Sequence, residues 1–376
     1  MSKQVKKTVL AVAAVVLLAL PVVEWVRFAY FTLRWPDVLL ELSRLLAVMG
    51  FVVLFFQYVL SSRVRIFEAT IGLDRLITAH RQTGIAALLL LLLHGVFLTT
   101  YELSLGFLSL RWEKLLGIGA LLLLLVVGGA ALLWKSLGWQ YETWKRIHYS
   151  SYVILPVGFV HGLLLGSTMR GSDLLTIYFW VLLGIYVLLI ASRVAKRLTV
   201  RANPHYVAAV ERESHDTVSL YFDGPVPSFD PGQFMIVNLE KPQGGYTESH
   251  PYTISSAPED DRLRLSAKAI GDFSSSVADV TPGSKALIEA PYGAFSYTTV
   301  PGQSLVFIAG GIGITPFLSQ LRALRARGES RRVTLIWGNK TQEDISFRDE
   351  LQAAERELPD FSLVHVLSHE QWEGEN

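Results

Sequence analysis

The sequence predicts a membrane protein built from a six-helix transmembrane bundle, a six-stranded antiparallel β-barrel and an α/β nucleotide-binding lobe. Three observations support this fold class. Long apolar runs gather before residue 192 of a 376-residue chain that is 51% hydrophobic. Short alternating runs separated by turn residues follow from about residue 200, and near residue 310 a glycine-rich turn joins a strand to a helix. We therefore expect domains at 1–197, 198–299 and 300–376.

Six segments are apolar and long enough to cross a bilayer, which takes about 20 residues. They cover roughly 8–30, 39–61, 80–102, 115–134, 148–166 and 173–192. The first begins with lysines, as a signal peptide does, but no small-residue cleavage site follows its apolar stretch, so we interpret it as a retained span.

The basic residues of the short loops predict the orientation. Lysine and arginine concentrate at the N-terminus and in the segments after the second, fourth and sixth spans, whereas acidic residues partly offset them on the opposite side. The positive-inside rule places the first side in the cytoplasm. We expect a multi-pass protein of the plasma membrane, with its N-terminus and its soluble half cytoplasmic.

Composition excludes several chemistries. The chain has no cysteine, which rules out disulfides, thiolate catalysis, iron–sulfur clusters and cysteine–zinc sites. Any electron transfer must therefore use organic cofactors or histidine-ligated metal. The formal net charge of +1 gives no indication of a nucleic-acid partner.

Four of the nine histidines lie in predicted spans: His80 and His94 in the third, His148 and His161 in the fifth. Ionisable side chains are costly in hydrocarbon and usually face the bundle interior. A single such histidine is equally well explained by an interhelical hydrogen bond. Four histidines in two matched pairs point instead to ligation.

The spacing places the histidines at two depths. At about 1.5 Å per residue, the 14-residue step in the third span covers roughly 21 Å and the 13-residue step in the fifth about 20 Å. Each level can hold one heme between two imidazoles. Thirteen residues also leave His161 about 140° from His148 around a straight helix, so we expect Pro156 to kink or rewind the fifth span.

Other ligand sets are less consistent with the spans. A copper site or a proton relay would need Met, carboxylate or further histidine ligands at these depths, and the spans supply none. Arg44, inside the outer end of the second span, is a candidate partner for a heme propionate or an anion. Arg63, Arg81 and Arg146 at the inner level are explained equally well by snorkelling and topology.

Two stretches of the predicted barrel carry possible flavin contacts. In the first, His250-Pro251-Tyr252-Thr253-Ile254-Ser255, an aromatic face and hydroxyls could meet an isoalloxazine ring, although plain barrel packing gives the same pattern. In the second, Lys268, Gly271, Ser274 and Ser275 surround a predicted helix start, whose backbone N–H groups could cradle a pyrophosphate.

A glycine-rich turn between a strand and a helix predicts a nucleotide site at Gly310, Gly311, Gly313, Thr315 and Pro316. Glycines let the backbone approach a phosphate, and a helix N-terminus favours its charge. The spacing differs from G-x-G-x-x-G, and such turns also occur without ligands. Asn339, Lys340 and Arg348 after the next strand leave the choice between NADPH and NADH open.

The order of these parts resembles the NADPH oxidase and ferric reductase superfamily, in which a ferric-reductase-like transmembrane domain precedes a ferredoxin–NADP-reductase-type module. The resemblance extends from about residue 40 onward and is strongest in the histidine spacing. It implies two b-type hemes, one held by His80 with His148 and one by His94 with His161, together with FAD and NADPH or NADH. It also implies flavin contacts from Tyr252 and Thr253, phosphate contacts from His250, and an Arg44 beside the outer heme.

The sequence also differs from the family pattern in one respect. Family members continue to a further strand with a Cys-Gly-Pro motif and a terminal aromatic residue, whereas this chain has no cysteine and stops at Asn376, soon after a predicted strand at 361–367. We therefore expect the C-terminal part of the lobe to be missing from the sequence as given.

The predicted function is transmembrane electron transfer from cytosolic NAD(P)H through FAD and two hemes to an acceptor outside. Short outer loops without a chelate site favour molecular oxygen, giving superoxide, over a ferric chelate. A third hypothesis is a heme-binding membrane anchor for a separate redox partner. Beyond lipid, NAD(P)H and the acceptor, the sequence indicates no nucleic-acid partner and no obligatory protein partner.

Overall fold

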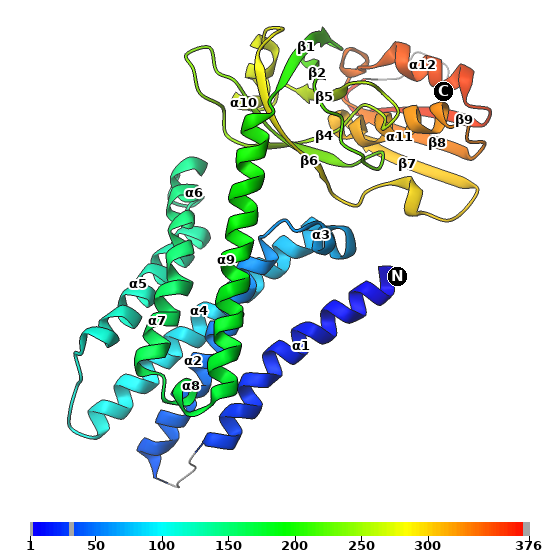
Figure 1. Cartoon of the computed structure of the whole chain (residues 1–376). Coiled ribbons are helices and arrows are strands. Elements are labelled where there is room, and N and C mark those ends of the chain that lie inside the picture. Colours follow the sequence, from blue (N-terminus) through cyan, green and yellow to red (C-terminus); the bar gives the residue numbers. More distant parts are fainter. Residues whose placement is uncertain (1–2, 30–33, 371–376) are drawn as a thin grey trace. The chain divides into compact units, whose positions relative to one another are not determined.

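The computed structural model describes residues 3–29 and 34–370, and its chain divides into two compact units, Met1–Val194 and Ala195–Asn376. The first unit is helical, and the second contains a barrel and an α/β lobe (Figure 1). Residue 30, the last of the first predicted span, lies outside the described residues.

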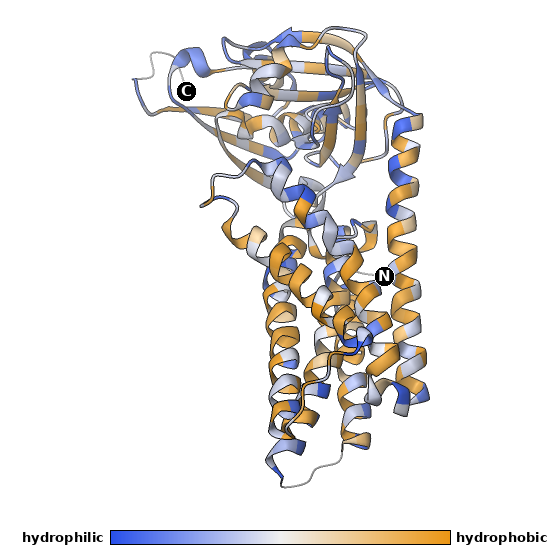
Figure 2. Cartoon of the chain, turned by 90° about the vertical axis from the view of Figure 1, so that its left-hand side faces the viewer, coloured by the Kyte–Doolittle hydropathy of each residue, from blue (hydrophilic) through white to orange (hydrophobic). Residues whose placement is uncertain are grey.

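Six helical segments of the described chain are long and apolar enough to cross a membrane. They are α1 (Lys3–Phe28), α2 (Trp35–Leu60), α4 (Leu73–Ser104), α5 (Trp112–Leu133), the composite Tyr141–Leu165, and α9 (Asp173–Ala202). The short helices α3 (Arg65–Ile71) and α8 (Ser167–Gly171) lie between them. Hydrophobic residues cover these helices in Figure 2. Leu122 and Leu188 are 57% and 69% exposed on outward faces, as lipid-facing side chains would be. The predicted spans are confirmed.

The fifth span is not one helix. It consists of α6 (Tyr141–Tyr149), the 3₁₀ segment η1 (Ser150–Val153) and α7 (Ile154–Leu165). A 3₁₀ residue turns the chain by about 120° rather than 100°, so four of them add about 80° and reduce the expected 140° offset between His148 and His161 to about 60°. The sequence predicts that Pro156 supplies this rotation. The 3₁₀ segment η1 occupies the turn just before Pro156, where a proline ring crowds the carbonyl four residues back, that of Tyr152.

Close packing of α2 with α4 and of α5 with α7 brings the histidine-bearing helices together with their neighbours. Gly50 on α2 allows part of this approach, because a Cβ there would lie 2.7 Å from a methyl group of Leu91 on α4. Small residues at helix interfaces have this role in membranes. Val52, Leu155 and Leu182 at the centre of the bundle are completely buried.

The second unit begins with the predicted six-stranded antiparallel sheet, in the order β4-β3-β6-β1-β2-β5. Its strands are β1 (His205–Arg212), β2 (Thr217–Asp223), β3 (Phe234–Leu239), β4 (His250–Thr253), β5 (Leu263–Lys268) and β6 (Lys285–Tyr292). The edge strands β4 and β5 approach each other at a bridge between Ile254 and Leu265. Leu220, Met235 and Ile254 are completely buried inside the curved sheet.

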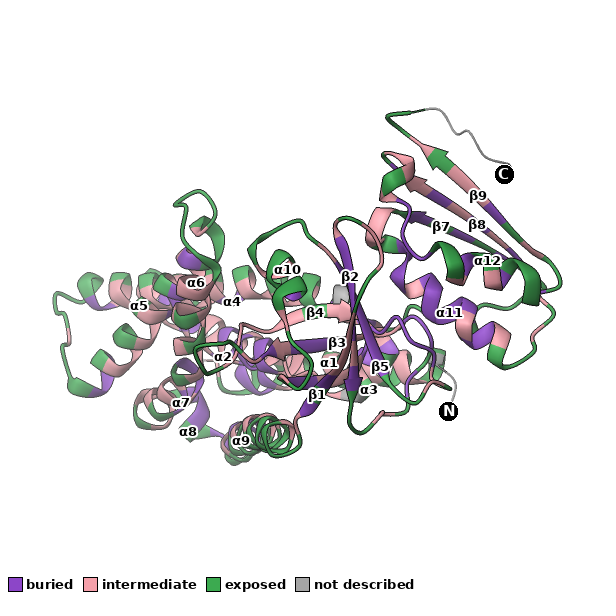
Figure 3. Ribbon diagram, turned by 90° about the horizontal axis from the view of Figure 1, so that it is seen from above, coloured by how far each residue is buried: buried purple, intermediate pink, exposed green. Residues whose placement is uncertain are grey.

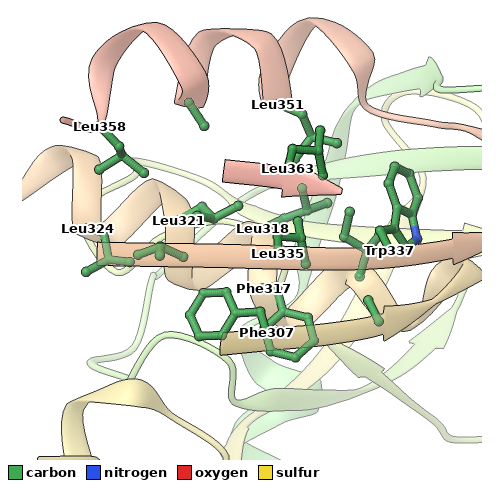
Figure 4. Close-up of a cluster of buried hydrophobic side chains, with 14 of the residues drawn as sticks. Phe307, Phe317, Leu318, Leu321, Leu324, Leu335, Trp337, Leu351, Leu358 and Leu363 are labelled. Carbon is green, nitrogen blue, oxygen red and sulfur yellow. The ribbon is translucent and has the colours of Figure 1, made fainter. Parts of the chain in front are cut away.

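The lobe that follows has a parallel sheet in the order β7-β8-β9. Its strands are β7 (Ser304–Gly310), β8 (Arg332–Asn339) and β9 (Phe361–Leu367), and its helices are α11 (Thr315–Ala326) and α12 (Arg348–Glu357). The buried face of α11 is purple in Figure 3. It packs Leu318 and Leu321 against Leu335 of β8, while Leu351 of α12 covers the same core (Figure 4). The predicted strand–turn–helix–strand unit is confirmed.

Candidate functional site

The outer pair of histidines lines one largely apolar cavity of about 460 Å³. Nδ1 of His94, on α4, donates to the main-chain oxygen of Ser43 at 3.0 Å. Nδ1 of His161, on α7, donates to that of Glu113 at 2.8 Å. The interhelical hydrogen bond expected of a structural histidine is therefore present in both cases. Because it uses Nδ1, it leaves the Nε2 lone pair of each ring available to a metal.

Gly117 of α5 forms the surface against which the His161 ring lies. A Cβ at this position would lie 2.6 Å from Cε1 of His161 and 2.8 Å from each ring nitrogen. A side chain and this ring position cannot coexist. Nothing in the sequence distinguishes Gly117 from Gly119, whose added Cβ would meet no atom within 4 Å.

Two cations line the same cavity. Arg44 pairs with Glu41 on α2, and its Nε is buried without a partner among the described residues. Lys114 at the start of α5 pairs with Glu102 of α4, and both of these side chains are about nine-tenths buried. The sequence pointed to Arg44 but did not single out Lys114, because the burial of Lys114 depends on its contact with Glu102 of α4.

The inner pair consists of His80 on α4 and His148 on α6, whose ring centroids are 6.0 Å apart with planes at 70°. Two imidazoles that ligate one metal from opposite sides have centroids roughly 6 Å apart, because each metal–nitrogen bond is about 2.0 Å and each nitrogen lies about 1 Å from its ring centre. Nδ1 of His80 contacts the main-chain oxygen of Gln57 at 3.3 Å. Nδ1 of His148 is buried and has no partner among the described residues.

These two levels fit heme. Each level joins two imidazoles from different helices, and the outer level adds an apolar cavity with cations that suit propionates. Of the other arginines considered for propionates, Arg81 and Arg146 have exposed side chains, in keeping with snorkelling and topology.

The first predicted flavin stretch lies on β4. The ring of His250 stacks on Phe273 at 3.7 Å and 15°, and Tyr252 lies 5.9 Å from the same ring. Thr253 is half-buried, whereas Pro251 is exposed. Burial raises the pKa of Tyr252. Phe273, which the sequence did not single out, thus joins β4 to the segment that holds the second predicted stretch.

Two of the predicted flavin residues are engaged elsewhere. Ser255 is completely buried in the barrel, where its hydroxyl lies 3.0 Å from that of Ser266. Lys268 pairs with Asp344 at 2.7 Å and with Asp216 at 3.0 Å. Burial alone would lower the pKa of Lys268, but its hydrogen bonds to the two carboxylates outweigh burial and raise it. The packing of β5 against the lobe therefore directs Lys268 to acids instead of a phosphate.

The second stretch forms the five-residue helix α10 (Asp272–Ser276). The hydroxyl of Ser274 accepts hydrogen bonds from the N–H groups of Ile270 and Gly271 at 3.0 and 2.9 Å. Ser275 is exposed. Ser274 thus occupies two of the backbone N–H groups that were predicted to bind a pyrophosphate.

The glycine turn follows β7 at the carboxyl edge of the parallel sheet, where α/β folds bind their ligands. Gly311 has φ +48°, and a Cβ added at Gly310, Gly311 or Gly313 would meet no atom within 4 Å. Thr315 and Pro316 begin α11. The turn is therefore open to an approaching ligand.

Asn339 ends β8 at the same edge of the sheet. Its side chain is buried, and neither amide atom has a hydrogen-bond partner among the described residues. Arg348 instead donates to the main-chain oxygens of Ile345 and Gln342. Both hydrogen-bonding groups of the buried Asn339 side chain are thus unused by the described residues, whereas part of the Arg348 guanidinium is engaged by the main chain.

Three family models match successive parts of the chain. Residues 46–159 match the ferric reductase like transmembrane component, residues 202–296 an FAD-binding domain, and residues 307–376 an oxidoreductase NAD-binding domain. The first match contains His80, His94 and His148, and the second contains the whole sheet from β1 to β6.

Curated relatives match part of the chain. The flavohemoprotein of Bacillus subtilis is 32% identical over 156 residues, which is 40% of this chain and 39% of the relative. NADH-cytochrome b5 reductase 1 of Candida glabrata is 32% identical over 140 residues, 35% of this chain and 49% of the relative. The chain thus spans less than half the length of either relative.

Among solved structures, a ferredoxin NADP+ reductase from Neisseria gonorrhoeae with bound FAD and NADP is 25% identical. That match covers 45% of this chain and 69% of the other, with a TM-score of 0.39. The ordered family matches decide the architecture. With a ferric-reductase-like transmembrane component followed by FAD-binding and NAD-binding domains, the chain has the architecture of the NADPH oxidase and ferric reductase superfamily of membrane oxidoreductases.

Proposed function

We propose that this protein transfers electrons across the membrane, from cytosolic NAD(P)H to an acceptor on the opposite side. The observation that carries the proposal is the pairing of four intramembrane histidines at two levels, in a chain that also contains FAD-binding and NAD-binding domains. When bound, FAD accepts a hydride and releases single electrons, and two b-type hemes carry those electrons through the bilayer.

The residues of the chain supply position and electrostatics. His80 with His148 and His94 with His161 would hold the two hemes at different depths. Main-chain carbonyls fix three of the four rings through Nδ1, which keeps Nε2 directed away from those carbonyls.

Arg44 and Lys114 would meet propionates at the outer level. Gly310, Gly311, Gly313 and Asn339 would contact the nucleotide.

Orientation rests on the loop charges, with the basic side cytoplasmic. Six spans return the chain to that side, so FAD and NAD(P)H would bind in the cytosol. This arrangement suits a supply of reduced nicotinamide nucleotide inside the cell.

The favoured acceptor is molecular oxygen, giving superoxide. The outer cavity is lined mainly by apolar side chains, and its two cations, Arg44 and Lys114, would be taken up by heme propionates in addition to their glutamate partners. A small neutral molecule could approach the outer heme through such an apolar lining without desolvating charge, whereas an anionic ferric chelate would find no further cation among the lining residues.

The test is a heme and flavin count on the purified protein, with reduced-minus-oxidised spectra before and after addition of NADPH or NADH. We expect two low-spin hemes and one flavin per chain. H80A and H94A should each lose one heme, while H215A, which alters an exposed histidine of the soluble unit, should keep both.

Cytochrome c reduction should be inhibited by superoxide dismutase. Reduction insensitive to the dismutase would favour a ferric chelate as acceptor. Absence of both flavin and NAD(P)H-dependent heme reduction would favour a membrane anchor that serves a separate partner.

A further inference from the structure

The four proposed heme ligands are not anchored alike. Three of them donate from Nδ1 to main-chain carbonyls at distances of 2.8 to 3.3 Å. His148 has no such acceptor: its Nδ1 is buried and unpartnered among the described residues. A hydrogen bond on the second nitrogen normally fixes the orientation of a ligand imidazole, so His148 must be oriented in another way.

An indole takes the place of the missing carbonyl. The ring of Trp144 stacks on His148 with centroids 5.3 Å apart and planes at 25°. Residues four apart on a helix face the same side, and both lie on α6, so the contact is local to this helix. Trp144 also stacks on Trp134, at 5.7 Å and 27°.

The stack also explains what holds the indole. Nε1 of Trp144 is buried and makes no hydrogen bond to the described residues. Tryptophans of the aromatic belt at a membrane surface typically direct the N–H toward the polar interface. Trp144 is therefore held by its ring contacts with Trp134 and His148.

We propose that Trp144 is a positioning residue for the inner heme: it fixes the plane of His148 by stacking where the other three ligands use a hydrogen bond. This inference rests on the proposed function, because it presupposes heme at the inner level. A flat indole against the imidazole restricts rotation of the ring about its last torsion angle. The indole accepts no hydrogen bond from Nδ1 of His148, and such a bond raises the basicity of a ligand imidazole. An iron held by His148 would therefore be tuned differently from the outer iron.

The experiment compares W144F, which retains a ring, with W144L, which does not, in the full-length purified protein. Heme content, the low-field EPR signals of the low-spin hemes and a redox titration are measured. We expect W144L to shift the EPR signal and the midpoint potential of one heme and to weaken its binding roughly tenfold. W144F should produce a smaller shift of the same heme. W139L, which removes a 39%-exposed tryptophan nearby, should change neither heme.

The outcomes separate the two proposals. If the wild type contains two hemes and W144L gives the same signals as the wild type, the role of Trp144 is overturned and the proposed function still stands. A wild type without bis-histidine heme would overturn the proposed function itself. If W144L does not accumulate, W144M replaces it, because an unbranched side chain fills similar space without a ring. Equal signals in W144M, W144F and wild type would then overturn the inference.

Discussion

Replacing Gly117 by alanine should damage the outer heme level specifically. The added Cβ would lie 2.6 Å from Cε1 of His161, whereas ordinary van der Waals contact begins at 3.4 Å. The ring must therefore retreat by about 0.8 Å, the difference between these two distances. Functional groups need to be held within about 0.5 Å of their productive position, so this displacement exceeds what ligation tolerates.

The same retreat affects the anchor of the ring. The bond from His161 to the main-chain oxygen of Glu113 is 2.8 Å long. If the ring moved by the full 0.8 Å along this direction, the atoms would be about 3.6 Å apart and no longer hydrogen-bonded. Loss of such a supporting bond typically costs 10–100-fold in metal affinity. We expect the affinity for the outer heme to fall by this factor.

G119A is the matched control. Gly119 is on the same helix two residues away, and its added methyl group meets no atom within 4 Å. Both changes favour the helix by roughly 1 kcal/mol, so a difference between them reports the contact with His161. Heme per chain and the low-spin EPR signals are measured in both purified variants. Two full-strength, unshifted hemes in G117A would refute the reasoning.

Three further predictions concern other parts of the molecule. Y58F and Y186F each remove a hydroxyl that donates to a carbonyl of η1. Each substitution should lower the free energy of unfolding by roughly 1 kcal/mol and shift the EPR signal of the outer heme. An unchanged signal would show that η1 keeps its shape without these two bonds. D344N should lower the melting temperature of the soluble unit at pH 7, because the hydrogen bond from Lys268 holds the pKa of Asp344 at about 2, below its ordinary 3.8. A group with a lowered pKa stabilises the fold above its ordinary pKa and loses this effect as pH falls through the lowered one; the difference from wild type should therefore shrink between about pH 4 and pH 2, and a constant difference would contradict this origin. N339L should raise the KM for the nucleotide while leaving thermal stability equal or higher, since it replaces an unpartnered buried amide by an apolar side chain; an unchanged KM would remove Asn339 from the nucleotide site.

Much of the architecture could be predicted from local pattern. Six apolar runs predicted the spans because a bilayer requires each segment to satisfy its own backbone and to expose apolar side chains. The glycine turn near Gly310 was recognisable because strand, turn and helix follow one another within a few residues. His80 and His94 could be placed on one face of a helix because fourteen residues nearly complete four turns.

Contacts between distant segments could not be predicted in the same way. The sequence offered Lys268 to a phosphate, but packing in the second unit gives it Asp344 and Asp216 as partners. Ser255 belongs to the predicted flavin motif, yet its hydroxyl lies inside the barrel, in contact with that of Ser266. Lys114 and Gly117 acquire their roles only from Glu102 and His161, which other helices bring to them.

The sequence by itself predicted two pairs of histidines at two depths, because the rise of a helix is constant and an ionisable side chain in hydrocarbon usually faces the interior of the bundle. Only the tertiary structure decided how each ring is turned. The 3₁₀ segment η1 brings His161 closer in phase to His148, main-chain carbonyls contact Nδ1 of three imidazoles, and the indole of Trp144 stacks on the fourth. The physical reason is that helix periodicity is local, whereas the contacts that set a torsion angle come from whatever packs beside it.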